Sequence, residues 1–230
     1  MELRRAGRDA LRIGHRGASA LARENSIEAL EAAAAHGLDG VEVDVSRARD
    51  GSLVLAHGPA VPDDAPLLGD GLAVVARLGL LVQLDMKARG AETEVVESLR
   101  RAGLLERAFV SGFSLPVLAA FARAAPELPR SYTYPDDRFG LSGRPTLRPA
   151  VAAGLAAMRA VLPRRLPRWL RAVGAEAATL HWAVVAPAVL AACHDRGKGV
   201  YVWTVNDGKL AGNLIEMGAD GIISDDPGIF

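Results

Sequence analysis

The sequence has little cysteine, little lysine and no long hydrophobic run, and each absence excludes a class of protein. Its single cysteine, Cys193, excludes an internal disulfide. Half of the 230 residues are hydrophobic, but no apolar stretch is long enough to span a bilayer. Residues 1–12 are too charged to form a signal peptide, so we expect a cytoplasmic protein.

The chain also lacks an excess of charge of either sign. Its 27 acidic residues balance 27 lysines and arginines, which argues against wholesale nucleic-acid binding. The length is sufficient to bury a substantial core and does not require a second domain. No internal repeat or low-complexity linker divides the sequence, so we expect one domain over residues 1–230.

Two acidic residues in an alternating segment suggest a metal site. Glu42 and Asp44 lie two positions apart within Gly40–Val45, and their neighbours are valines. In a β-strand, such acids share one face and the valines take the opposite, apolar face. Because nearby carboxylates repel each other unless a cation lies between them, the pattern predicts a Mg²⁺ or Ca²⁺ site. A solvent-exposed strand edge is the alternative interpretation.

A second apolar segment, Leu81–Lys87, has the same form. Asp85 and Lys87 share a strand face, and Lys87 is one of only three lysines in the chain. Asp85 could complete a carboxylate triad around one cation, while the ammonium could hold an anionic substrate. A simple ion pair between Asp85 and Lys87 is the alternative.

A histidine and an arginine stand between two glycines at the end of a short predicted strand. The segment reads Gly14, His15, Arg16, Gly17, and glycine permits unusual backbone angles or the close approach of a ligand. The planar guanidinium of Arg16 suits phosphate, and His15 can carry a proton near neutral pH. A turn with an exposed histidine and arginine is the alternative.

A second histidine returns towards the acids through a predicted hairpin. Arg49–Ser52 has the composition of a turn, so Leu53–His57 can fold back antiparallel to the strand that carries the acids. This arrangement would bring His57 beside Glu42 as a candidate acid–base residue. A structural histidine at a strand end is the alternative.

Predicted strands and helices alternate along the rest of the chain. The first helix is expected to begin with Asn25 as its N-cap and Glu28 as the capping-box partner. The expected strands are Leu11–Ile13, Gly40–Val45, Leu80–Met86, Ala108–Gly112, Arg130–Tyr134, Ala177–Leu180, Val200–Val205 and Gly221–Ser224. Further helices are expected at Glu92–Ala102, Leu115–Ala125, Pro149–Ala160, Pro187–Asp195 and Lys209–Met217. This count predicts a single α/β (β/α)₈ TIM barrel with a short hairpin arm after the second strand.

Six motifs in order resemble those of the glycerophosphodiester phosphodiesterases. The segments are Gly14–Gly17, Glu24–Asn25, Gly40–Asp44, Asp85–Lys87, Tyr201–Asn206 and Gly218–Pro227. The resemblance implies a TIM barrel that hydrolyses glycerophosphodiesters to glycerol 3-phosphate and an alcohol. It also implies one divalent cation, Mg²⁺ or Ca²⁺, with Mn²⁺ as an alternative.

The resemblance also implies roles for individual residues. The acid–base pair would be His15 and His57, and the metal ligands would be Glu42, Asp44 and Asp85. Substrate would be bound by Arg16, Glu24, Lys87 and Trp203. Trp203 would present a flat apolar wall to the glycerol carbons, with a core aromatic at the barrel rim as the alternative.

Three departures from the family pattern bear on the substrate. Gly58 follows His57 where the family usually has Asp, and the third carboxylate is Asp85 rather than Glu. The stretch between His57 and Asp85 is too short for the capping insertion of many members, which implies a more open pocket. A lipid phosphodiesterase of the lysophospholipase D or sphingomyelinase D type, or a non-catalytic binding module on a degenerate barrel, is therefore the alternative function.

One long region is rich in arginine and lacks acids. Residues 138–175 contain no Asp or Glu, and eight arginines lie between Arg138 and Arg171. Within Leu162–Arg171 the basic residues alternate with Leu and Trp, a composition that could contact an anionic membrane. The alternative is an arginine-rich outer helix with Trp169 packed inward.

Overall fold

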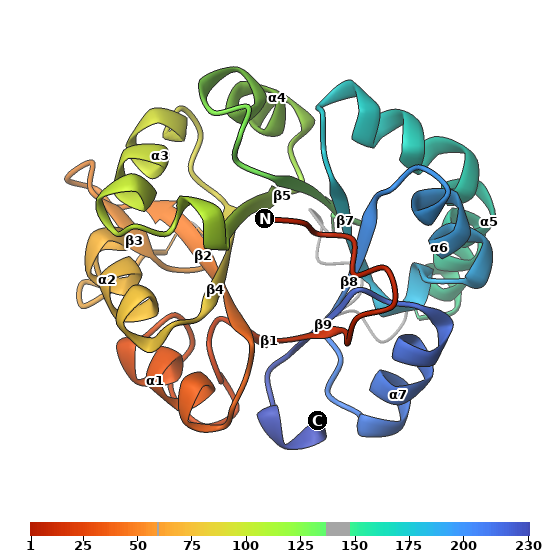
Figure 1. Ribbon diagram of the computed structural model, residues 1–230, viewed down its shortest axis with the longest axis horizontal. Helices are drawn as coiled ribbons and strands as arrows, with labels where there is room; N and C mark the ends of the chain where they lie inside the picture. The colour runs from red at the N-terminus through yellow and green to blue at the C-terminus, as the bar shows by residue number, and fades with distance from the viewer. Residues whose placement is uncertain (59, 137–147) are drawn as a thin grey trace.

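The structure, a computed structural model, describes residues 1–58, 60–136 and 148–230. Eight parallel strands close into a barrel surrounded by helices, because β1 pairs with both β2 and β9 (Figure 1). These strands are β1 (Leu11–His15), β2 (Gly40–Arg47), β4 (Leu81–Met86), β5 (Ala108–Gly112), β6 (Arg130–Tyr134), β7 (Ala177–His181), β8 (Gly199–Trp203) and β9 (Gly221–Ser224). The expected TIM-barrel fold is confirmed.

A short hairpin arm extends the barrel after its second strand. β3 (Leu53–Leu55) pairs antiparallel with the end of β2, with Ser46 opposite Val54. The Ser46 hydroxyl donates to the carbonyl of Ala56 at 2.7 Å and fixes the chain just before His57. The predicted hairpin is therefore confirmed, and it returns His57 to the end of the barrel that β2 reaches.

Seven α-helices occur in the described residues, one more than the sequence predicted. They are α1 (Ile27–Ala35), α2 (Leu68–Leu78), α3 (Glu92–Arg101), α4 (Leu115–Ala124), α5 (Arg148–Ala172), α6 (Pro187–His194) and α7 (Gly208–Met217). The unpredicted helix is α2, whose Gly71 weakens its helical signal. A Cβ atom at Gly71 would lie 2.4 Å from Leu55 Cδ1, so the glycine admits the side chain from the hairpin arm.

The helix α5 continues well beyond its expected end. It contains Pro163 and Pro167, each of which removes a backbone donor that a helix interior normally uses. Leu162, Leu166 and Leu170 are buried at four-residue spacing, so they hold this face of the helix against the barrel. Packing therefore maintains the helix through both prolines.

The N-terminal segment closes one end of the barrel, across which it runs in Figure 1. Leu3 is buried in an interior cluster with Phe109 and Tyr201, and the Tyr201 hydroxyl donates to the Leu3 carbonyl at 3.1 Å. The buried carboxylate of Asp220 accepts from the Arg4 guanidinium at 2.7 Å. This end is filled by side chains, which leaves the carboxyl ends of the strands for a site.

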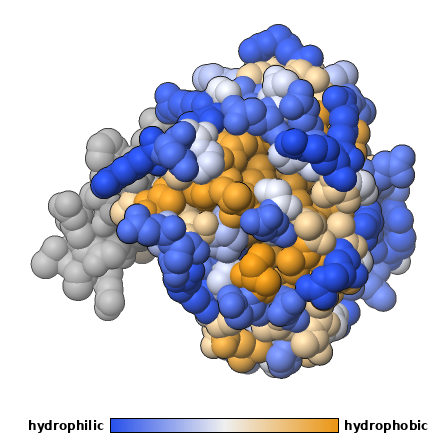
Figure 2. All heavy atoms as spheres, turned by 90° about the vertical axis from the view of Figure 1, so that its left-hand side faces the viewer, coloured by the Kyte–Doolittle hydropathy of each residue, from blue (hydrophilic) through white to orange (hydrophobic). Residues whose placement is uncertain are grey.

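The outer face around α2 and α3 is mainly hydrophilic, with apolar areas between the charged side chains (Figure 2). The half-exposed Leu67, directly before α2, is one of the large apolar side chains at the surface. Among the residues that the structure describes, no helix is both long enough and apolar enough to cross a membrane.

Candidate active site

A pocket of about 270 Å³ opens at the carboxyl ends of the strands. It is lined by His15, Arg16, Glu42, Asp44, His57, Gln83, Asp85, Lys87, Phe113, Thr133, Asp136, Thr179, Trp203 and Ile223. This end of a (β/α)₈ barrel is where such folds place their chemistry. Of the residues that the sequence predicted for the site, Glu24 alone does not line the pocket.

The turn after β1 is shaped by its glycines. Arg16 has a positive φ of 56°, and its backbone N–H donates to Glu42 Oε2 at 3.0 Å. Gly17 has a φ of 83°, and a Cβ atom there would lie 2.7 Å from the backbone of Ala29. The close approach of this turn to α1 requires glycine, and it aims the Arg16 N–H at the acidic strand.

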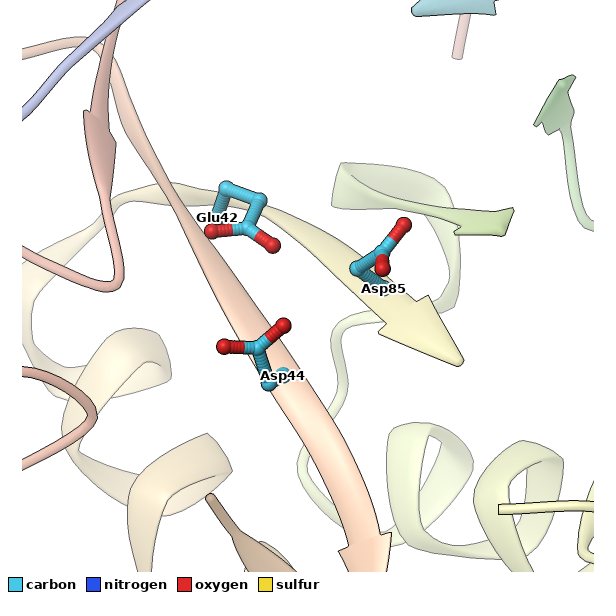
Figure 3. Close-up of side chains that lie close together, drawn as sticks. All are labelled: Glu42, Asp44 and Asp85. Atoms are coloured by element: carbon cyan, nitrogen blue, oxygen red, sulfur yellow. The ribbon is translucent and has the colours of Figure 1, made fainter. Parts of the chain in front are cut away.

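Three buried carboxylates converge in the pocket, as the sequence predicted (Figure 3). Glu42 and Asp44 point from β2, and Asp85 points from the neighbouring β4, with Asp44 opposite Asp85 in register. One oxygen of each lies within 4.8 Å of the others. This set of oxygen donors suits a hard divalent cation.

Two of these carboxylates have strongly shifted pKa values. Burial and the neighbouring Asp44 charge raise the pKa of Glu42 to about 8. Burial alone would raise the pKa of Asp44 as well, but a hydrogen bond from His57 and the charge of Lys87 lower it. The raised pKa means that the ionised form of Glu42 lacks sufficient compensating positive charge, which a bound cation would supply.

The Lys87 ammonium lies between two of the acids. Its Nζ is 3.0 Å from Asp44 Oδ1 and also contacts Asp85 Oδ2. Burial lowers the pKa of Lys87, but the two carboxylates outweigh that effect and raise it, so the group stays charged. Nζ also lies 5.3 Å from the centre of the Phe113 ring. The predicted ion pair and the predicted pocket position are both present.

Two hydroxyl groups that the sequence reasoning missed hold Asp85. Ser111 Oγ donates to Asp85 Oδ1 at 2.6 Å, and Thr133 Oγ1 donates to the same oxygen at 3.2 Å. Both residues are buried near the carboxyl ends of β5 and β6. The sequence could have indicated both residues, because each is a small polar residue near the end of a predicted barrel strand.

His15 is oriented by Asp225, a further residue without a predicted role. His15 Nδ1 lies 2.7 Å from Asp225 Oδ1, while Nε2 is 4.0 Å from Glu42 Oε2. Asp225 also accepts from Ser19 at 2.9 Å and from Asn206 at 2.6 Å. Burial lowers the pKa of His15, but Asp225 and Glu42 outweigh it and raise the pKa. Asp225 follows β9 within the motif Gly218–Pro227, and its place in that motif could have indicated a role in the site.

The sequence predicted that His57 would lie beside Glu42, but in the structure His57 contacts Asp44. Its Nδ1 lies 3.2 Å from Asp44 Oδ1. The side chain of His57 is 45% exposed, against 17% for His15. The two histidines therefore approach different members of the carboxylate cluster, and His57 stands nearer to solvent.

Asn25 belongs to the site and does not cap a helix. Its Nδ2 donates to Asp44 Oδ2 at 3.0 Å, and its Oδ1 accepts from the Asp44 backbone N–H at 3.0 Å. The predicted N-cap is wrong, because Ser26 Oγ caps α1 by accepting from the Ala29 N–H. Asn25 has a positive φ of 57°, which an asparagine tolerates better than most residues.

Arg16 connects Asp44 with the edge of the pocket. Its Nε lies 3.1 Å from Asp44 Oδ2 but is not aligned for a hydrogen bond, while Nη1 donates to Glu24 at 2.5 Å. Trp203 donates its indole N–H to the Thr179 carbonyl at 3.3 Å. Glu24 therefore positions Arg16, and the Trp203 side chain lines the pocket.

Fold and pocket together define a (β/α)₈-barrel hydrolase with paired histidines, a carboxylate cluster and cationic side chains. The chain belongs to the glycerophosphoryl diester phosphodiesterase family, whose sequence profile matches residues 15–65 and 81–229. The family resemblance expected from the sequence is confirmed, and the chain is an enzyme of that family.

Relatives and solved structures agree with this assignment. A glycerophosphodiester phosphodiesterase of Caldanaerobacter subterraneus is 24% identical over 94% of this chain and 93% of its own. A crystal structure from Silicibacter pomeroyi superposes with a TM-score of 0.78, 23% identity and coverage of 99% of this chain and 94% of that one. A phosphodiesterase from Oleispira antarctica, solved with its product sn-glycerol 3-phosphate, has a TM-score of 0.74 and 20% identity over 95% and 94% of the chains.

Proposed function

We propose that this protein is a metal-dependent phosphodiesterase that hydrolyses glycerophosphodiesters to glycerol 3-phosphate and an alcohol. The observation that carries the proposal is the placement of His15 and His57 against different members of one buried carboxylate cluster. The relatives named as glycerophosphodiester phosphodiesterases and the Oleispira product complex support the substrate class.

Positive charge in the pocket suits an anionic substrate. Arg16 and Lys87 would hold the phosphate, because a guanidinium and an ammonium pair with its oxygens. A cation held by Glu42, Asp44 and Asp85 would neutralise the charge that develops on the non-bridging oxygens. The cationic side chains and the carboxylate cluster thus have complementary roles.

The two histidines would move the protons. Nδ1 of His15 faces Asp225 and Nδ1 of His57 faces Asp44, so each ring has Nε2 left for the substrate. One ring would accept the proton of the attacking water or substrate hydroxyl as the new P–O bond forms. The other would donate a proton to the leaving alkoxide as the old P–O bond breaks, and such transfers contribute about 10²- to 10⁴-fold each.

A substrate panel tests this function directly. Purified protein is assayed with several glycerophosphodiesters, lysophospholipids and sphingomyelin, each with Mg²⁺, Ca²⁺ or Mn²⁺, and glycerol 3-phosphate is quantified. Release of glycerol 3-phosphate from water-soluble diesters supports the proposal. Turnover confined to lipid substrates would transfer the assignment to the lipid phosphodiesterase alternative, and no turnover with any pair would overturn both.

The structure supports only part of the membrane contact that the sequence of the arginine-rich region suggested. Trp169 packs against Tyr132 and Tyr134 with ring centres 5.9 and 5.5 Å away, so it is turned towards the barrel. The exposed side chains of this part of α5 include Arg164 and Arg168. We therefore propose that any contact with an anionic membrane is electrostatic, without insertion of Trp169.

Vesicle co-sedimentation tests this electrostatic contact. Binding to anionic vesicles that disappears at high salt, and in an Arg164, Arg165 and Arg168 triple alanine variant, supports it. Equal, negligible binding to anionic and neutral vesicles contradicts it.

Arg138 and Arg144, from the same sequence region, lie outside the described residues. The cytoplasmic location and the one-domain organisation stay predictions.

A further inference from the structure

Gln83 is a buried polar residue in the lining of the pocket, and no role has yet been assigned to it. It lies on β4, two positions before Asp85, and it is opposite Glu42 in the register of β2 and β4. Only 2% of its surface is exposed, and it lines the pocket. It therefore shares the inward face of the barrel with two of the converging carboxylates.

The hydrogen bonds of Ser111 determine how the Gln83 amide is turned. Ser111 Oγ has one proton, which it donates to Asp85 Oδ1 at 2.6 Å. It must then accept from Gln83 Nε2, which lies 2.9 Å away. Because the amide nitrogen faces Ser111, the carbonyl oxygen of Gln83 points away from Ser111.

That oxygen, Gln83 Oε1, is buried and has no hydrogen-bond partner among the described residues. Buried acceptors are rarely left unpaired, because removal from water without a replacement partner costs free energy. An acceptor in the lining of the pocket that also holds the three carboxylates, opposite Glu42 in register, adds to the negative potential there and attracts a cation rather than an anion. The unpaired oxygen therefore points to a ligand of positive charge.

We propose that Gln83 Oε1 belongs to the oxygen shell of the divalent cation held by Glu42, Asp44 and Asp85, in contact with the ion or one of its waters. Hard cations take six or more oxygen ligands, and amide carbonyls are among those that proteins supply. This inference rests on the cation site of the proposed function. It adds a neutral oxygen donor to the carboxylates.

A purely structural role for Gln83 would act through Ser111, which holds Asp85. The two roles are separated by Gln83→Met, Ser111→Ala and the double variant. Gln83→Met keeps the approximate length but removes the oxygen, whereas Ser111→Ala breaks the link to Asp85 and leaves the Gln83 oxygen in place. The change caused by Gln83→Met in each background isolates the direct contribution of the oxygen.

The experiment measures Mg²⁺ and Mn²⁺ dissociation constants by calorimetry, without substrate, for the wild type and the three variants. We expect Gln83→Met to weaken binding about tenfold or more, in the range typical of residues around a metal site. We expect a similar loss when the change is made in the Ser111→Ala background. Equal affinities of Ser111→Ala and the double variant would overturn the proposal, because Gln83 would then act only through Asp85.

A second variant keeps the test decisive if Gln83→Met fails to fold. Gln83→Glu retains an oxygen at the same position and adds charge, so it should bind the cation at least as tightly as the wild type. Weaker binding by a folded Gln83→Glu would overturn the proposal. A wild type that binds no cation would overturn the metal-dependent function itself, whereas tight wild-type binding with unchanged variants would remove only the role of Gln83.

Discussion

His15 Nδ1 and Asp225 Oδ1 lie 2.7 Å apart and join the ends of the first and last strands of the barrel. The contact exists because β1 pairs with β9 when the barrel closes. It fixes the His15 ring with Nδ1 bound and Nε2 left for the pocket. Barrel closure therefore determines which nitrogen of His15 meets the substrate.

Replacing Asp225 should impair catalysis more than folding. Asp225→Asn removes the charge that orients and stabilises the protonated His15 ring, so we expect kcat to fall at least about tenfold with little change in KM. Ser19→Ala is the matched control, because it removes a hydrogen bond to Asp225 Oδ1 and leaves the Asp225 carboxylate in place. Steady-state kinetics measure both, and an unchanged kcat in Asp225→Asn would contradict the orienting role.

Removing either pocket histidine should abolish turnover and leave the fold intact. His15→Ala and His57→Ala act at the rim of the barrel, so we expect thermal melting curves close to that of the wild type. The exposed His36, at the end of α1, provides the control variant His36→Ala with normal activity. If a pocket variant keeps more than about a tenth of the wild-type kcat, its proton-transfer role is wrong.

Activity should depend on a divalent cation through the carboxylate cluster. We expect Asp85→Ala to raise the metal concentration required for half-maximal activity, because the cluster loses one of its three oxygen donors. Metal titration of the chelated enzyme measures this shift. Asp50→Ala, in the exposed hairpin turn, should leave the titration unchanged. Full turnover after exhaustive chelation would rule out a catalytic cation at this site.

The single cysteine should report unfolding. Burial and the nearby Asp220 charge raise the pKa of the Cys193 thiol to about 12, and the residue has no exposed surface. Since the thiolate is the reactive form, the folded protein should not react with a maleimide or an aromatic disulfide at about pH 8. Full reaction should follow in denaturant. Rapid labelling of the native protein would show that Cys193 is accessible.

Asp220 should stabilise the closed end of the barrel without affecting chemistry. Its buried carboxylate accepts from the Arg4 side chain and from the backbone N–H groups of Arg5 and Val200, at 2.7 to 2.8 Å. We expect Asp220→Ala to lower the free energy of unfolding by about 3–5 kcal/mol, as for other broken buried pairs. Urea denaturation measures the loss. Unchanged stability, or a large fall in kcat of the folded variant, would contradict this separation.

Local periodicity was sufficient to predict the barrel and the centre of the site. Glu42 and Asp44 share a face because side chains alternate along a strand, whatever the strand later pairs with. The turn at Arg49–Ser52 similarly encodes the hairpin that carries His57. These features depend on neighbours within a few residues, so the sequence alone determined them.

The hydrogen-bond partners across the barrel were decided only by the tertiary structure. Asn25 is a residue type that often caps helices, yet the register of the barrel places Asp44 beside it. Ser26 caps the helix instead. Asp225 meets His15 only after all eight strands have closed, and the amide of Gln83 is turned by a hydroxyl from the next strand. Such contacts join residues far apart in the chain, and no local pattern specifies which of several polar groups will be brought within bonding distance.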